Sequence, residues 1–310
     1  MKRIRFLAAA AALCITQVAQ AQTLGIATMQ PGTLAHTVAS SIAKVLKEKG
    51  GMNVLVQPTS GESTALAIVG KGDAPLGLAN AIEVGMAVPQ NPNLRMVGAV
   101  NPVRAGIFVR KASPMKTIAD LKGRRVPMGY AAMRALDGMS RAILATGGLS
   151  EKDIRSVMAP NVIRAADDFV AGNAEAFLFA FGAPKVREVD ASVGGIRALE
   201  IPESPGMAAA RPHSPYGYLT EVQPGPVFVG VERPMKVYTF DQMLYTHTGV
   251  PDDVVYKVID TMANNKAELA VVAPALREFA LENMYKSYDF AYHPGALKYF
   301  RNKNLAAKAL

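Results

Sequence analysis

The stretch "TLGIATMQPGTLAHTVASSIAKVLKEKGGMNVLVQPTSGESTALAIVGKGDAPLGLAN" (residues 23–80) decides the fold. It alternates β-prone runs with segments of helical periodicity, in which apolar residues such as Val38, Ile42 and Val45 recur at helical spacing. The expected strands are 23–28, 52–59 and 74–80, and the expected helices are 34–50 and 60–72, both ending in glycine. Such βαβ units predict a mostly parallel sheet with helices on its faces.

The alternation begins again after residue 104 and builds a second unit of the same kind. The expected strands are 105–113, 124–130, 154–159 and 174–181, and the helices are 117–123, 133–147 and 162–172. Residues 202–236 are rich in Pro and Gly, so we expect irregular structure there. A long strand, 236–249, and two helices, 251–265 and 268–285, then return the chain to the first unit.

Two α/β units predict a two-lobed protein with a ligand cleft between the lobes. Ligands of such sheets bind where the strands end and the helices begin, and hinge closure around the ligand is the known motion. We expect lobe I to contain residues 22–105 and 241–310, and lobe II to contain residues 106–240.

The first 21 residues have the three parts of a secretory signal peptide. A basic head (Lys2, Arg3 and Arg5) precedes an apolar run over residues 6–15, and Ala19-Gln20-Ala21 is a cleavage signal. The apolar run is too short to span a bilayer, which takes about 20 residues. We therefore expect cleavage after Ala21 and a periplasmic product.

Cysteine use agrees with export without disulfides. Cys14 is the only cysteine and lies inside the expected signal peptide. A lipoprotein cysteine is the alternative, but Leu13 precedes it where a small residue is needed. The mature chain would depend on its hydrophobic core, and 289 residues (310 less 21) are enough to build one.

A basic charge balance can indicate nucleic acid, an anionic membrane or an anionic small molecule as partner. Of 34 basic residues, three lie in the signal, so 31 face 25 acidic residues and the mature net charge is +6. The basic clusters at 122–125 and 298–303 have few aromatic residues between them, so they read as solvated faces and not as a nucleic-acid site. We expect a monomer that binds no nucleic acid.

No motif of an enzyme is present in the sequence. The histidines His36, His213, His247 and His293 share no local motif, and there is no zinc-protease, cysteine-nucleophile or Walker pattern. The isolated acids Glu62, Asp167 and Asp168 read as surface groups or caps. We expect no catalytic residue, no metal and no cofactor.

Two strand-to-helix turns carry the polar residues of a candidate binding site. The first turn holds Thr28, Gln30 and Thr33, and the second holds Ser60, Ser63 and Thr64. Hydroxyls and free backbone N–H groups at a helix N-terminus bind anions, but the same residue types also serve as ordinary N-caps. Both interpretations stay open for either turn alone; together they favour a site.

Taken in order, the motifs resemble those of the TAXI-family solute receptors of TRAP (tripartite ATP-independent periplasmic) transporters. The resemblance rests on 25–46, 56–81, "IADLKGRRVPMG" (118–129), "AEAFLFAFGAP" (174–184) and "HPGALKYF" (293–300), and it covers nearly the whole mature chain. It implies a two-lobed periplasmic-binding fold of the second type. It also implies capture of a small carboxylate or amino acid, delivery to TRAP permease subunits, and no use of ATP.

The chain departs from the family at the first helix of lobe II. Many members have Ser-Gly-Thr there, whereas this chain has Ala132-Met133-Arg134-Ala135. Arg134 is either a bidentate clamp for a carboxylate or a surface arginine. The departure favours a carboxylate other than the usual amino acid.

The remaining candidates lie at strand ends. Phe177, Phe179 and Phe181 alternate on one sheet face, and Phe181 at the carboxyl end is the one expected to touch ligand. Asn80 and Tyr130 are either ligand contacts or turn residues. The predicted site is Thr28, Gln30, Thr33, Ser60, Ser63, Thr64 and Asn80 from lobe I, with Tyr130, Arg134, Phe181 and Gly182 from lobe II.

Two alternatives and one structural prediction complete the hypothesis. An ABC-type or sensory receptor of the same fold is the first alternative, and an exported enzyme on that fold is the second. The His293-Pro294-Gly295 turn predicts a terminal helix that fastens the chain end through Leu297, Tyr299 and Phe300.

Overall fold

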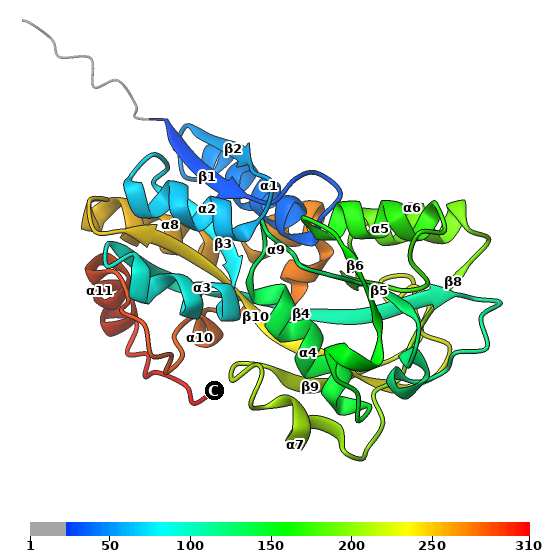
Figure 1. Cartoon of the computed structure of the whole chain (residues 1–310). Coiled ribbons are helices and arrows are strands. Elements are labelled where there is room, and N and C mark those ends of the chain that lie inside the picture. Colours follow the sequence, from blue (N-terminus) through cyan, green and yellow to red (C-terminus); the bar gives the residue numbers. More distant parts are fainter. Residues whose placement is uncertain (1–22) are drawn as a thin grey trace, which may run out of the picture.

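The protein folds into two lobes that share one large sheet (Figure 1). The computed structural model describes residues 23–310, so the expected signal peptide lies outside the described residues. The sheet has eight strands, in the order β2-β1-β3-β10-β4-β7, with β8 also paired to β4 and β9 to β10. Its strands are β1 (Leu24–Thr28), β2 (Val54–Pro58), β3 (Leu76–Asn80), β4 (Leu94–Arg110), β7 (Phe177–Ala180), β8 (Ile196–Ala198), β9 (Tyr218–Val222) and β10 (Met235–His247).

The first lobe has the predicted βαβ order. Strands β2, β1 and β3 are parallel, and the helices that follow them are α1 (Leu34–Glu48), α2 (Glu62–Lys71), α3 (Ala81–Ala87) and the short 3₁₀ helix η1 (Val88–Gln90). Helix α1 buries Val38, Ile42 and Leu46, as the periodicity predicts. The Thr33 side chain accepts a hydrogen bond from the His36 N–H, which starts this helix.

Two long strands carry the chain between the lobes. Strand β4 spans 17 residues and β10 spans 13, and they pair antiparallel. The sequence predicts a strand only from residue 105. In the structure β4 begins at Leu94, and a bulge lies in its ladder with β10 beside Gln242. The sheet is therefore mixed, and the proposed lobe boundaries (105/106 and 240/241) fall on these two strands.

The second lobe packs its helices around a parallel pair of strands and the far end of the large sheet. Its further elements are η2 (Ile118–Leu121), β5 (Arg125–Met128), α4 (Ala135–Thr146), η3 (Glu151–Asp153), β6 (Arg155–Met158), α5 (Val162–Val170), α6 (Pro184–Ser192) and α7 (Gly206–Ala210). Strands β5 and β6 are parallel. Residues 202–236 are less irregular than predicted, since they contain α7 and β9.

The C-terminal segment returns to the first lobe, as predicted (Figure 1). It forms α8 (Asp252–Asn264), α9 (Lys266–Val272), η4 (Pro274–Glu278), α10 (Leu281–Met284) and α11 (Pro294–Asn302). The single helix expected over 268–285 is wrong, because Pro274 interrupts it.

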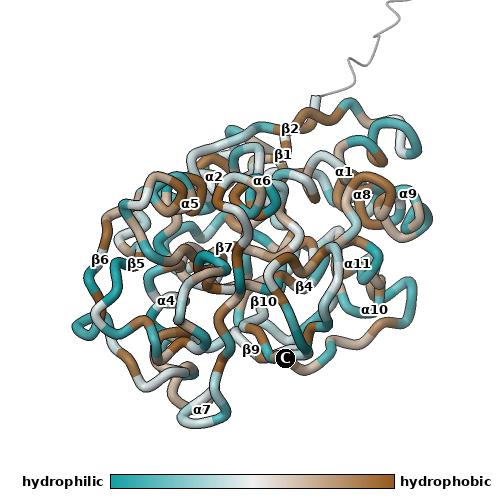
Figure 2. The backbone as a smooth tube through the Cα atoms, turned by 90° about the vertical axis from the view of Figure 1, so that its right-hand side faces the viewer, coloured by the Kyte–Doolittle hydropathy of each residue, from teal (hydrophilic) through white to brown (hydrophobic). Residues whose placement is uncertain are grey.

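The terminal helix α11 fastens the chain end as predicted. His293 is buried and its side chain accepts a hydrogen bond from the Gly295 N–H, while Tyr299 and Phe300 are fully buried. Figure 2 shows hydrophobic and hydrophilic residues on the outer helix α8, whose buried side includes Val255 and Ile259. Among the described residues, no helix has both the length and the hydropathy to cross a membrane.

Candidate functional site

A cavity of about 60 Å³ lies where the two lobes meet. Most of its lining is apolar and comes from both lobes, for example Met29 and Leu34 with Met133 and Leu178. The polar side chains in the lining are Thr33, Glu62, Asn80 and Gln242. A small organic molecule with a few polar groups suits such a lining.

Glu62 is the buried acid of this cavity. It begins α2, is 3% exposed, and receives two hydrogen bonds from Asn80. The Asn80 N–H donates to Oε1 at 3.0 Å, and the Asn80 side-chain amide donates to Oε2. Burial, with the nearby charge of Glu83, raises the pKa of Glu62 to about 8. The expectation of a surface group or simple cap was wrong, because the lobe closes over this residue.

Glu83 joins the two lobes through hydrogen bonds. It lies on α3 and is 3% exposed, and its Oε2 accepts the Ala135 N–H of the second lobe at 2.7 Å. The Ser63 hydroxyl donates to Oε1 of Glu83 and accepts the Arg134 N–H at 3.1 Å. Burial raises the pKa of Glu83, and these hydrogen bonds oppose that effect.

Two close backbone approaches support the same junction. The Ser63 N–H donates to the Ala132 carbonyl at 3.3 Å, and the Lys185 N–H donates to the Gly32 carbonyl at 3.1 Å. A Cβ on Gly61 would lie 2.1 Å from the Ala132 oxygen, so only glycine permits this contact. The described conformation is therefore one in which the lobes touch.

Thr33 and Asn80 are the two predicted site residues that line the cavity. Both are also helix caps: Thr33 Oγ1 accepts from the His36 N–H at 3.2 Å, and Asn80 Oδ1 accepts from the Glu83 N–H at 2.8 Å. The two interpretations of these turns are thus compatible, because a residue at the N-terminus of a helix in this cleft can serve as a cap and still line the cavity.

The other first-lobe candidates lie around the cavity and not in its lining. Ser60 Oγ and Thr64 Oγ1 are 3.0 Å apart, and the Gln30 side-chain amide donates to the Ser60 carbonyl at 3.2 Å. Thr28 is fully buried, and its hydroxyl has no hydrogen-bond partner in the described part of the chain. Ligand contact by these residues stays a prediction.

Three second-lobe candidates, Tyr130, Phe181 and Gly182, make contacts within their own lobe. The Tyr130 hydroxyl is buried and donates to the Pro127 carbonyl at 3.2 Å. Phe181 packs against Phe108 and Phe228, with ring centroids 5.0 and 5.6 Å apart. Gly182 has a φ of 79° and sits beside Val227.

Arg134 is exposed and does not line the cavity. Its backbone N–H makes the contact with Ser63, while its guanidinium contributes a favourable charge near Glu83. Its role as a carboxylate clamp stays untested.

Sequence reasoning missed Gln242 and Phe179. Gln242 lies on β10, is 2% exposed, and its Oε1 has no hydrogen-bond partner among the described residues. The signal available was its position, next to Asp241, as a polar residue inside the long strand predicted over 236–249. Phe179 lines the cavity and Phe181 does not; Phe181 lies just beyond Ala180, the last residue of β7.

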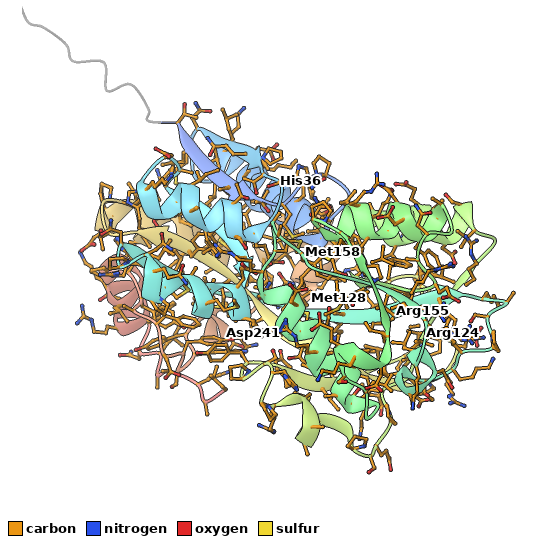
Figure 3. The ribbon with its side chains drawn as sticks, in the orientation of Figure 1. His36, Arg124, Met128, Arg155, Met158 and Asp241 are labelled. Carbon is orange, nitrogen blue, oxygen red and sulfur yellow. The ribbon has the colours of Figure 1, made fainter. Side chains whose placement is uncertain are left out.

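Two sets of charged residues lie outside this cavity, one on the second lobe and one around Asp241 (Figure 3). Arg124 and Arg155 lie on the β5–β6 side of the second lobe, and the Arg124 guanidinium is 3.3 Å from Glu175. On β10, Asp241 is 3% exposed and accepts hydrogen bonds from Lys286, Tyr288 and Tyr218, which we call the Asp241 cluster. Within residues 23–310 no group of His, Cys, Asp and Glu has the arrangement of a metal site.

Comparisons with known proteins identify relatives of this chain. Residues 26–303 match the NMT1-like family. The alkanesulfonate-binding protein SsuA from Xanthomonas axonopodis pv. citri, bound to MOPS, is 17% identical, with a TM-score of 0.53 and coverage of 92% of this chain and 94% of that one. PhnD1 from Prochlorococcus marinus, in complex with methylphosphonate, is 10% identical, with a TM-score of 0.58 and coverage of 92% and 99%.

A structure described as a periplasmic transporter is 13% identical, with a TM-score of 0.60 and coverage of 91% of this chain and 92% of that one. At these identities the likeness concerns the fold. The predicted two-lobed periplasmic-binding fold is confirmed.

Proposed function

Because this chain belongs to the NMT1-like family, we propose that it is an exported solute receptor whose lobes close around a small organic molecule. The observation that carries the proposal is the cavity between the lobes, whose lining comes from both of them. Closure of such a cleft changes the outer shape, which a membrane transporter can recognise. No catalytic step is part of the proposal.

The class of transporter is the first open choice. The sequence resembles a TRAP receptor, but the comparisons support the ABC-type alternative better, since the named neighbours are sulfonate- and phosphonate-binding proteins and neither name indicates a TRAP receptor. We therefore propose an ABC-type receptor first and a TRAP receptor second. Crosslinking of the closed protein to membranes of its own cell, followed by identification of the captured subunit, separates the two.

The chemistry of the ligand is the second open choice. The expected carboxylate gains no support from the cavity, because its polar lining is Thr33, Glu62, Asn80 and Gln242, without a cationic side chain in the described residues. The mature chain's basic balance is located elsewhere, on exposed groups such as Arg125 and Lys298.

Ligand capture tests the receptor function directly. Protein exported by its own cell and purified without refolding is analysed by native mass spectrometry, and a thermal-shift screen of amines, sulfonates, phosphonates and carboxylates follows. We expect a bound small molecule and at least one compound that raises the melting temperature without being converted. Turnover of a bound compound would favour an enzyme, and absence of any binding would reject the receptor.

A further inference from the structure

The cavity offers acceptors of hydrogen bonds and no cation to pair with them. Glu62 and Gln242 both line it, and both are at least nine-tenths buried. The side-chain oxygen Oε1 of Gln242 is buried without a hydrogen-bond partner in the part of the chain that the structure describes. A buried acceptor without a partner is costly, so a ligand that donates a hydrogen bond there would remove the cost.

No positive side chain compensates Glu62. Within residues 23–310, the cavity lining contains no lysine, arginine or histidine. The groups that surround Glu62 are Asn80 at the start of α3, Glu83 on α3 and Tyr245 on β10, and Arg134 of α4 lies near Glu83. An anion placed beside Glu62 would hold this carboxyl group in its protonated form, whereas a cation would allow it to ionise.

The N-terminus of α4, which could otherwise bind an anion, is already occupied. The N–H groups that start α4 point to the first lobe, where Glu83 accepts the Ala135 N–H and Ser63 accepts the Arg134 N–H. The protein thus provides its own carboxylate at the position where a helix N-terminus binds anions. A ligand carboxylate would have to displace Glu83 from this contact.

Resting on the proposed receptor function, we propose that the cavity selects a ligand with N–H donors on a compact apolar body, of the ammonium or amidinium class, and disfavours anions. The donors bind Glu62 and Gln242, and the apolar part contacts side chains such as Leu178 and Phe179. The small volume of the closed cavity suits a compact ligand.

Isosteric compounds of different charge test this assignment. Titration calorimetry at pH 7 compares acetamidinium, acetamide and acetate, which are small enough for the cavity. We expect acetamidinium to bind about 10- to 100-fold more tightly than acetamide, the range expected for hydrogen bonds to a charged group. Acetate should bind most weakly, and acetamidinium binding should release protons because Glu62 ionises.

Two variants separate recognition from folding. Glu62→Gln should remove the preference for amidinium over amide, while the exposed Glu282→Gln, of the same lobe and the same chemistry, should retain it. Since the new amide would face the Asn80 amide, Glu62→Gln also lowers stability. Gln242→Leu leaves Glu62 and its Asn80 contacts in place, so it should keep the fold while weakening amidinium binding several-fold.

The outcomes distinguish this assignment from the receptor function itself. If acetate, methanesulfonate or methylphosphonate binds more tightly than acetamidinium, the ligand class is wrong and the receptor function stands. Preference for amidinium that survives Glu62→Gln also overturns the assignment. If none of these compounds binds and no small molecule accompanies the exported protein, both proposals fail.

Discussion

Two buried acids, Glu62 and Asp241, lie in the same protein with different neighbours. Asp241 receives hydrogen bonds from Lys286, Tyr288 and Tyr218, so its charge is compensated inside the protein. Among the described residues, Glu62 receives hydrogen bonds from the two Asn80 N–H donors and has a second acid, Glu83, nearby, and its pKa is raised to about 8. Asp241 therefore has a structural role, whereas Glu62 has no cation to pair with in this part of the chain.

The difference shows how burial separates a structural carboxylate from a candidate binding group. Both side chains are almost fully buried, so exposure alone does not distinguish them. The presence of a cation distinguishes them. A buried carboxylate that pairs with a lysine keeps its charge, whereas one without a cation is protonated unless a ligand supplies the positive charge.

Removing the cation of the Asp241 cluster should have the largest effect. Lys286→Met leaves Asp241 buried without its positive partner, and we expect a loss of about 3–5 kcal/mol in the free energy of unfolding, measured by urea denaturation. The exposed Lys298→Met of α11 is the control. The double variant Asp241→Asn/Lys286→Met should recover much of the loss, and a single variant as stable as the wild type would contradict the pairing.

The pH dependence of stability should report Glu62. Its folded pKa, about 8, is above the ordinary 4.5, so the folded state holds the proton while the unfolded state loses it. The contribution is complete below about pH 4.5 and is lost as the pH rises towards 8, at about 1.4 kcal/mol per pH unit.

Urea unfolding of the wild type and of Glu62→Gln at several pH values isolates this contribution. The difference between the two unfolding free energies should change by about 2–3 kcal/mol between pH 5 and pH 7. Carboxyl groups that are common to both proteins and remote from Glu62 cancel in that difference, whereas Glu83, whose charge raises the pKa of Glu62, contributes to it. Parallel pH curves would mean that Glu62 has an ordinary pKa.

Weakening the junction between the lobes should have a smaller effect. Glu83→Gln removes one of the two acceptors that bind Ala135 and Ser63, and we expect a loss of about 1–3 kcal/mol in stability. Hydrogen exchange at the Ala135 amide should become faster, and the radius of gyration should increase if the lobes separate. Glu282→Gln should change neither quantity.

Local sequence patterns predicted much of the first lobe, because its information lies in short stretches. The spacing of Val38, Ile42 and Leu46 predicted α1, and Thr33 before it predicted the cap that the structure shows. The turn at His293-Pro294-Gly295 predicted α11 in the same way. In each case a few neighbouring residues determine both the helix and its start.

The patterns failed where contacts at long range decide the outcome. Strand β4 begins at Leu94, eleven residues before the predicted start at 105, because β10 provides a partner strand along the whole segment. The sequence left open whether Arg134 is a ligand clamp or a surface arginine; in the described conformation its backbone N–H binds Ser63 and its guanidinium does not line the cavity, and the clamp stays a prediction.

The sequence by itself determined the order of strands and helices and the two-lobed class, since hydrophobic periodicity, caps and turns are local properties. Only the tertiary structure decided what each polar residue does. Glu62 and Gln242 carry no motif in the sequence. They become a candidate site because closure of the lobes buries both beside one cavity, whose lining within residues 23–310 contains no cationic side chain. Which acid pairs with a lysine and which lies in a cavity depends on contacts between distant segments, so only the tertiary structure determines it.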